Sequence, residues 1–226
     1  MSFFLLAALA ASPGDGLETR TPQQAASRIA KNAQTGTLLF SRGDCLAVKV
    51  YTGSEITHVG AVVLRGGKPF VYESANGAGV RRVSLRRYLE LQQPCDVRVI
   101  HPVKPFSAAR ERAFVKALDE QLDRPYGIKH FRSGERAAGL HCAEYVTDAL
   151  CACRLIRAKN PVRVSPGSLR SGVVKSALYS QASTHRIANP VRKAPANADW
   201  CARTWFDTKR CTSDCCAQLS RWFLCR

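Results

Sequence analysis

The stretch Gly139-Leu140-His141-Cys142-Ala143-Glu144-Tyr145-Val146 decides the fold. It leads from a glycine-containing loop into an apolar run that continues through Leu150, a pattern that predicts a helix beginning at Cys142. Backbone N–H groups and the positive end of the dipole at a helix N-terminus stabilise a thiolate, and the same N–H groups bind an oxyanion. An isolated cysteine in such a run is more often a small buried hydrophobe. Whether Cys142 is a nucleophile therefore depends on residues upstream.

A β-hairpin is predicted upstream, with strands at 57–64 and 69–74 and a turn at Gly66-Gly67. If these two glycines form the loop, Glu73 lies opposite Gly60 on the neighbouring strand. His58 shares a face with Gly60, so Glu73 becomes a diagonal neighbour of His58. A register shift of one residue would send Glu73 to the other face. The hairpin thus predicts a His58–Glu73 pair on condition of this register.

Three side chains supply the chemistry of a cysteine hydrolase. Cys142 offers a thiolate, His58 a base, and Glu73 a carboxylate that orients the base. The alternative is a structural histidine with a solvated glutamate. The competing histidines are His101, His130, His141 and His185; beside Cys142, the side chain of His141 is expected to diverge from the thiol. No two histidines show metal-ligand spacing, so neither a metal nor a cofactor is predicted.

The remaining pattern predicts helices and strands around these residues. A helix is expected over Glu18–Ala33, with Thr21 as N-cap and Pro22 at its first position, and another after Ser107. Further predicted elements are strands at 37–40, 80–83 and 97–100, a basic helix at 85–91, and a last turn capped at 165–166. The segment 45–51 fits a helix or a strand equally well.

Composition bounds the partners and the compartment. The 226-residue chain has a formal net charge of +17, which favours an anionic cell envelope, a membrane surface or nucleic acid as partner. Nucleic acid is the least favoured, because no aromatic-rich or helix-turn-helix pattern accompanies the charge. Residues 1–12 resemble a signal peptide, although a basic n-region is missing, and indicate a secreted or periplasmic protein. Five of the ten cysteines lie beyond residue 200, so a disulfide-bonded tail is expected.

The order of motifs resembles the circularly permuted NlpC-type papain-fold cysteine hydrolases, the YiiX/YebB-like group. The motifs are the strand at 37–40, the segments 52–60, 72–74, 79–80 and 124–126, and the stretch 141–146. The resemblance implies an α+β fold with an antiparallel sheet packed against helices and the nucleophile at a helix N-terminus. It implies Cys142 as nucleophile, His58 as base and Glu73 as orienting group. It also implies that Tyr126 lies at the wall of a substrate site. The chain departs from the group at Thr37, where an aspartate is usual, and at Ala143, where serine is common.

These observations predict a signal peptide at 1–12, a hydrolase domain at 18–181 and a basic cysteine-rich tail at 182–226. The expected activity is cleavage of an amide or ester in a peptidoglycan peptide or an acyl-lipid. The alternative is a non-catalytic basic module that binds the cell envelope or an anionic membrane surface.

Overall fold

A seven-stranded sheet organises the protein, in the order β1-β7-β6-β2-β3-β4-β5. The structure is a computed structural model that describes residues 18–42, 46–92, 95–188 and 194–220. The strands are β1 (Thr19–Arg20), β2 (Leu38–Arg42), β3 (His58–Arg65), β4 (Lys68–Ala75), β5 (Gly79–Ser84), β6 (Cys95–Pro102) and β7 (Tyr179–Ile187). All neighbouring strands run antiparallel except β1 and β7, which are parallel. The sheet is therefore almost wholly antiparallel, as expected.

The predicted hairpin register is confirmed. Arg65 pairs with Lys68 and Ala61 with Tyr72, which places Glu73 in the register opposite Gly60. Gly66 and Gly67 have φ of 56° and 74°, so both adopt the left-handed conformation of a tight two-residue turn. A side chain would strain either position, and the turn fixes the register on which the site depends.

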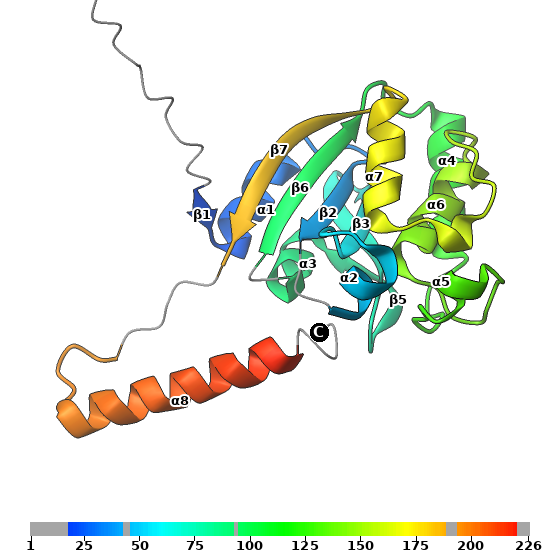
Figure 1. Cartoon of the computed structure of the whole chain (residues 1–226). Helices are drawn as coiled ribbons and strands as arrows, with labels where there is room; N and C mark the ends of the chain where they lie inside the picture. The colour runs from blue at the N-terminus through cyan, green and yellow to red at the C-terminus, as the bar shows by residue number, and fades with distance from the viewer. Residues whose placement is uncertain (1–17, 43–45, 93–94, 189–193, 221–226) are drawn as a thin grey trace, which may run out of the picture.

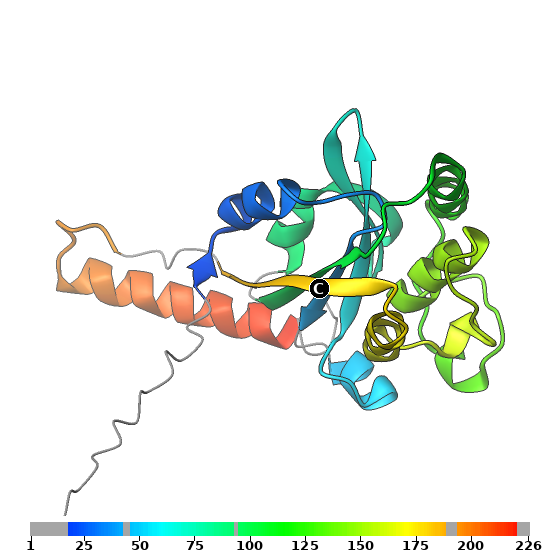
Figure 2. The same ribbon diagram turned by 90° about the horizontal axis from the view of Figure 1, so that it is seen from above.

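Helices cover both faces of the sheet, as Figure 2 shows edge-on. On one face lie α1 (Pro22–Ala30) and α3 (Leu85–Gln92), packed against each other. The opposite side carries α4 (Ala108–Asp119), α6 (Cys142–Ala152) and α7 (Pro166–Lys175), together with the short α2 (Leu46–Thr52), α5 (His130–Ser133) and the 3₁₀ turn η1 (Pro161–Arg163) (Figure 1). The fold is α+β, with α6 packed on β3, β4 and α4.

Two apolar cores follow from this layering. The larger lies between the sheet and α4, α6 and α7, and its largest side chains include Phe40, Phe114 and Tyr145. The smaller lies under α1 and α3 and includes Ile29, Leu39, Val62, Tyr88 and Leu89. Adjacent residues Leu39 and Phe40 enter opposite cores, because successive side chains of a strand point to opposite faces. Both faces of the central strands are therefore buried.

Three predicted boundaries move. The first helix begins at Pro22 after a capping box at Thr21, while Thr19–Arg20 form β1, so the expected start at Glu18 is wrong. The segment 45–51, for which helix and strand were equally expected, is helical in its described part. After Ser165 a single last turn was expected, but the structure has the ten-residue helix α7, whose N-terminus carries a capping box. Strand β7 runs to Ile187, so the sheet extends past the expected domain boundary at residue 182.

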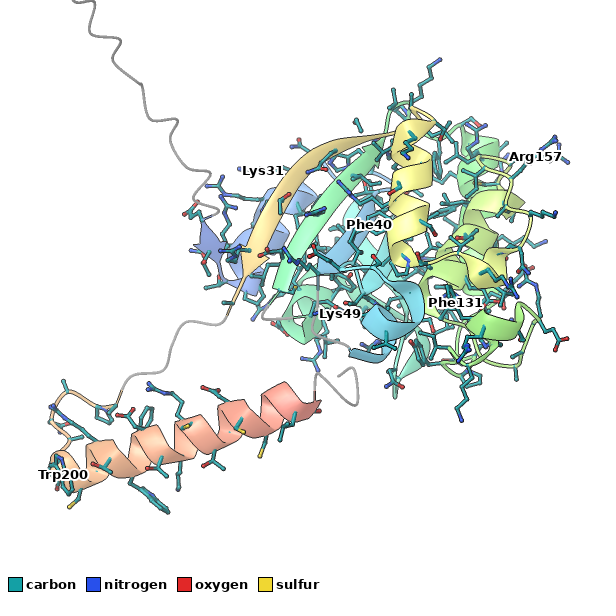
Figure 3. The ribbon with its side chains drawn as sticks, viewed as in Figure 1. Lys31, Phe40, Lys49, Phe131, Arg157 and Trp200 are labelled. Carbon is teal, nitrogen blue, oxygen red and sulfur yellow. The ribbon has the colours of Figure 1, made fainter. Side chains whose placement is uncertain are left out.

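Beyond the sheet, the tail forms one helix, α8 (Trp200–Leu219). Figure 1 shows α8 beside the domain rather than within its layers. Figure 3 places Trp200 at the end of α8 farther from the domain, and its side chain is 77% exposed. The four described tail cysteines, Cys201, Cys211, Cys215 and Cys216, are free, so the expected disulfides are not formed among them. Cys225 and the expected signal peptide lie outside the described residues.

In the described ranges, no helix combines the length and apolar character needed to cross a membrane.

Candidate active site

Cys142 is the first residue of α6, as the sequence predicts. His141 is the N-cap, with φ −92° and ψ 164°, and its Nδ1 accepts a hydrogen bond from the backbone N–H of Glu144 at 3.2 Å. The expectation that the side chains of His141 and Cys142 diverge is wrong. It assumed helical geometry for both residues, whereas the extended N-cap turns the imidazole back over the helix end, where it acts to lower the pKa of the Cys142 thiol.

His58 and Glu73 meet as the hairpin register requires. His58 Nε2 lies 2.7 Å from Glu73 Oε2, and the Glu73 side chain is fully buried. The other oxygen of Glu73 forms an ion pair with Arg81, 2.7 Å from Nη2 and 2.9 Å from Nε. Arg81 lies directly opposite Glu73 in the pairing of β5 with β4. The carboxylate is therefore held from both sides, which fixes the His58 imidazole that it contacts.

The charges of Cys142 and His58 stabilise each other. Burial alone would raise the pKa of Cys142, but the positive charge of His58 and hydrogen bonds from His141 and His58 lower it to about 6. Burial alone would lower the pKa of His58, but the thiolate and then Glu73 raise it to about 10. Burial also acts to raise the pKa of Glu73, yet His58 and Arg81 hold it below its usual range. At neutral pH the arrangement is a thiolate–imidazolium pair backed by a carboxylate.

An aromatic ring supports the imidazole. The rings of His58 and Tyr88 stack with centroids 6.0 Å apart and an interplanar angle of 27°. Tyr88 is fully buried, and its hydroxyl lies 3.2 Å from Ser41 Oγ. Since Tyr88 comes from α3 and Ser41 from β2, two elements of the fold fix the plane of the His58 ring.

Tyr126 lies beside the thiol, where the family resemblance expects a site wall. Burial and then the negative charge of Cys142 raise the pKa of the Tyr126 phenol. Its backbone pairs with Leu140, two residues before Cys142. A Cβ at Gly139 would stand 2.9 Å from the Tyr126 carbonyl carbon and from the Gly127 nitrogen, so only glycine permits this close approach.

The other histidines lie elsewhere. His101 Nδ1 is 2.8 Å from Thr37 Oγ1, and the His185 ring lies between Arg20 and Ser183. His130 belongs to α5 and contacts Glu144 on α6 at 2.7 Å, so it flanks the region of Cys142. In the described residues His58 is thus the histidine paired with both the thiol and a strand carboxylate.

Sequence reasoning missed Arg81 and the His130–Glu144 contact. The position of Arg81 could have been predicted, because pairing the next strand across the turn at 76–78 places Arg81 opposite Glu73. The His130–Glu144 contact joins two segments through an irregular loop, for which the sequence carries no periodic signal.

A thiol at a helix N-terminus, an imidazole on the neighbouring sheet and a carboxylate behind it define the papain-like class of thiol hydrolases. Residues 32–187 match the family described as permuted papain-like amidase enzyme, YaeF/YiiX, C92 family. The match covers well over half of the chain, so this protein belongs to that family of cysteine amidases and peptidases. Permutation explains why His58 and Glu73 precede Cys142 in the sequence.

One solved structure with a similar arrangement is the crystal structure of metalloprotein yiiX from Escherichia coli O157:H7. The two share 19% sequence identity with a TM-score of 0.47, over 68% of this chain and 88% of that one. None of the curated proteins matches the chain.

Proposed function

We propose that the chain is a thiol hydrolase in which Cys142, His58 and Glu73 cleave an amide or ester bond through an acyl-enzyme. The observation that carries the proposal is the thiolate–imidazolium pair, with the pKa of Cys142 lowered to about 6 and that of His58 raised to about 10. A thiolate is the reactive form of cysteine, and an imidazolium beside it has the proton that the leaving group needs.

The reaction follows from these positions. The Cys142 thiolate attacks the carbonyl carbon and forms a C–S bond, and the oxyanion is bound at the N-terminus of α6, where the first N–H groups have no helical acceptor. His58 donates its proton to the departing amine or alcohol as that bond breaks. Water then attacks the thioester, His58 takes its proton, and the thiolate leaves. Glu73 holds the imidazole in place throughout.

The proposed substrates are a peptide of an anionic cell envelope or an acyl-lipid. The net charge of +17 supports a polyanionic location for either substrate. Export is part of the proposal, and mass spectrometry of the natural protein tests it: a mature N-terminus near residue 12 supports export, whereas an intact Met1 contradicts it.

The experiment that tests the function compares wild-type protein with Cys142→Ser on acyl peptide amides and on acyl-lipid vesicles. Wild type should release product and carry a transient acyl adduct on Cys142 detectable by mass spectrometry, and the variant should show neither. Circular dichroism serves as the folding control. Turnover by Cys142→Ser at the wild-type rate would exclude the mechanism, and which substrate is cleaved distinguishes peptide from lipid.

A binding-only function is favoured by one feature, the exposed aromatic side chains of α8. Trp200 and Trp205 are 77% and 62% exposed on a chain of high positive charge. Such a helix suits the surface of an anionic membrane. Salt-sensitive binding to phosphatidylserine vesicles without any acyl adduct on Cys142 would support this alternative, whereas adduct formation would favour the hydrolase.

A further inference from the structure

A second cluster of imidazole and carboxylate groups lies next to Cys142. His130, His141 and Glu144 each contribute one atom able to bind a metal, and these atoms all lie within 4.8 Å of one another. His141 and Glu144 come from the start of α6, and His130 from α5. The proposed hydrolytic mechanism uses neither His130 nor the carboxylate of Glu144.

The contacts in the cluster converge on one point. His130 Nε2 is 2.7 Å from Glu144 Oε2, and His141 Nε2 is 3.8 Å from the same oxygen. His141 Nε2 also lies 2.8 Å from the backbone oxygen of Val162 in η1. The two contacts of 2.7 and 2.8 Å each join an imidazole nitrogen to an oxygen, so each is a hydrogen bond with a proton between the two atoms. A metal ion binds the same lone pairs once those protons are displaced.

The carboxylate of Glu144 is incompletely satisfied. Its side chain is fully buried, and Oε1 has no hydrogen-bond partner among the described residues. The nearest cation is Arg136, with Nη1 at 3.6 Å from Oε1, but this guanidinium binds Asp148 through two hydrogen bonds of 2.6 and 2.7 Å. A buried carboxylate oxygen without a hydrogen bond is costly, and a cation bound by both oxygens of Glu144 would reach Oε1 as well as the Oε2 that faces the histidines.

The geometry points to a site for a divalent transition-metal ion of the Zn²⁺ type, held by His130 Nε2, His141 Nε2 and Glu144. Two imidazoles and one carboxylate are a ligand set typical of zinc, with the Val162 oxygen or water available for a fourth position. Occupation requires each imidazole to give up its Nε2 proton, to Nδ1 or to solvent. For His141 the proton moves to Nδ1, and the 3.2 Å hydrogen bond that Nδ1 accepts from the Glu144 N–H is lost.

Aromatic contacts hold the two imidazoles close together. The His130 and His141 ring centroids are 5.8 Å apart, and Phe131 meets the His141 ring edge-on at 5.6 Å. Figure 3 labels Phe131, which lies at α5. Since both ligand rings are fixed before any ion arrives, little ordering is needed on binding.

The test is Co²⁺ binding to the full chain after dialysis against EDTA, followed by visible absorption and competition with Zn²⁺. Cobalt bound by nitrogen and oxygen shows d–d bands, whereas cobalt on the chain's cysteines adds a thiolate charge-transfer band. We expect one non-thiolate Co²⁺ per chain, displaced by Zn²⁺ and retained in Cys142→Ser. Its absence from the wild-type protein would overturn the proposal.

Two carboxylate variants provide a matched comparison. Glu144→Gln should weaken the non-thiolate site at least tenfold, because it removes a direct ligand. Glu73→Gln is the control, since Glu73 is an equally buried carboxylate at the same 2.7 Å from an imidazole, and among the described residues it forms no metal-binding cluster with a second histidine. Full retention of Co²⁺ in Glu144→Gln, or equal loss in both variants, would contradict the site. If Glu144→Gln does not fold, His130→Phe on α5 tests the same prediction.

Discussion

Two histidine–glutamate contacts of equal length in the described part of the chain look alike in isolation and differ in what surrounds them. His58–Glu73 and His130–Glu144 both join Nε2 to a fully buried carboxylate at 2.7 Å. Arg81 hydrogen-bonds the second oxygen of Glu73, whereas the second oxygen of Glu144 has no hydrogen bond among the described residues and only a 3.6 Å ion pair with Arg136. The first pair is therefore complete and orients a base, and the second is open to a ligand. The partner of the second carboxylate oxygen, rather than the histidine–glutamate contact itself, decides whether the pair orients an imidazole or binds a ligand.

The largest effect expected from this difference is on hydrolysis. Glu73→Gln should reduce turnover of a fluorogenic acyl amide by roughly 10³- to 10⁴-fold, because the neutral amide no longer stabilises the His58 imidazolium. Glu144→Gln, measured in the same metal-free buffer, should cost at least tenfold less. Equal losses would mean that both carboxylates act on the base and would remove the distinction.

An intermediate effect is expected on the reactivity of Cys142. The rate of its alkylation by iodoacetamide, followed by mass spectrometry at that residue, should rise through about pH 6 and stay level to about pH 10. The sign follows because the lowered thiol pKa keeps the thiolate above pH 6, and the raised His58 pKa keeps its partner charged below pH 10. In His58→Ala the thiol should titrate near or above 8.5, a loss of about 30-fold in rate at pH 7.

The same titration sharpens the comparison. Glu73→Gln should move the midpoint of Cys142 upward, since it weakens the positive charge of His58, whereas His185→Asn should leave it near 6 because that ring lies with Arg20 and Ser183. An unshifted midpoint in His58→Ala would show that the thiol owes its acidity to the helix end and His141 instead.

The smallest effect concerns the two arginines. Arg81→Ala should lower the free energy of unfolding by about 1–2 kcal/mol in urea titrations at pH 7, because it leaves the buried Glu73 charge with less compensation. Arg136→Ala should cost under about 1 kcal/mol, since its guanidinium is half exposed and 3.6 Å from Glu144. The reverse order would mean that Arg136, not a cation from solution, neutralises Glu144.

The contrast between the pairs also shows what the sequence predicts. The His58–Glu73 pair was predictable because Gly66-Gly67 fixes the hairpin register and short-range pairing determines which residues face each other. The helix start at Cys142 was predictable from its loop and apolar run. The second pair was not, because the loop between α5 and α6 has no periodicity to place His130. His141 and Glu144 are three residues apart at a helix start, and this spacing alone predicts that their side chains are neighbours.

The absence of a local sequence signal also explains why β7 and α8 were not predicted. Strand β7 pairs with β6 from a distant part of the chain, and such pairing leaves little local trace at residues 182–187. The helix α8 begins after an N-cap at Asp199, but its cysteines predicted disulfides, which do not form among the described cysteines.

The parallel pairing of β1 with β7 brings the two ends of the domain to one sheet edge, with the Ala188 N–H donating to the Arg20 carbonyl at 3.1 Å. A short linker could therefore join residue 188 to residue 18, and a new opening in the exposed connection after β6, at Val103, would leave every strand pairing intact. The rearranged gene would encode the cysteine before the histidine, the usual order for papain-like enzymes. Such a rearrangement changes the order of the segments in the sequence, but it leaves the strand pairings and the side chains around Cys142 unchanged.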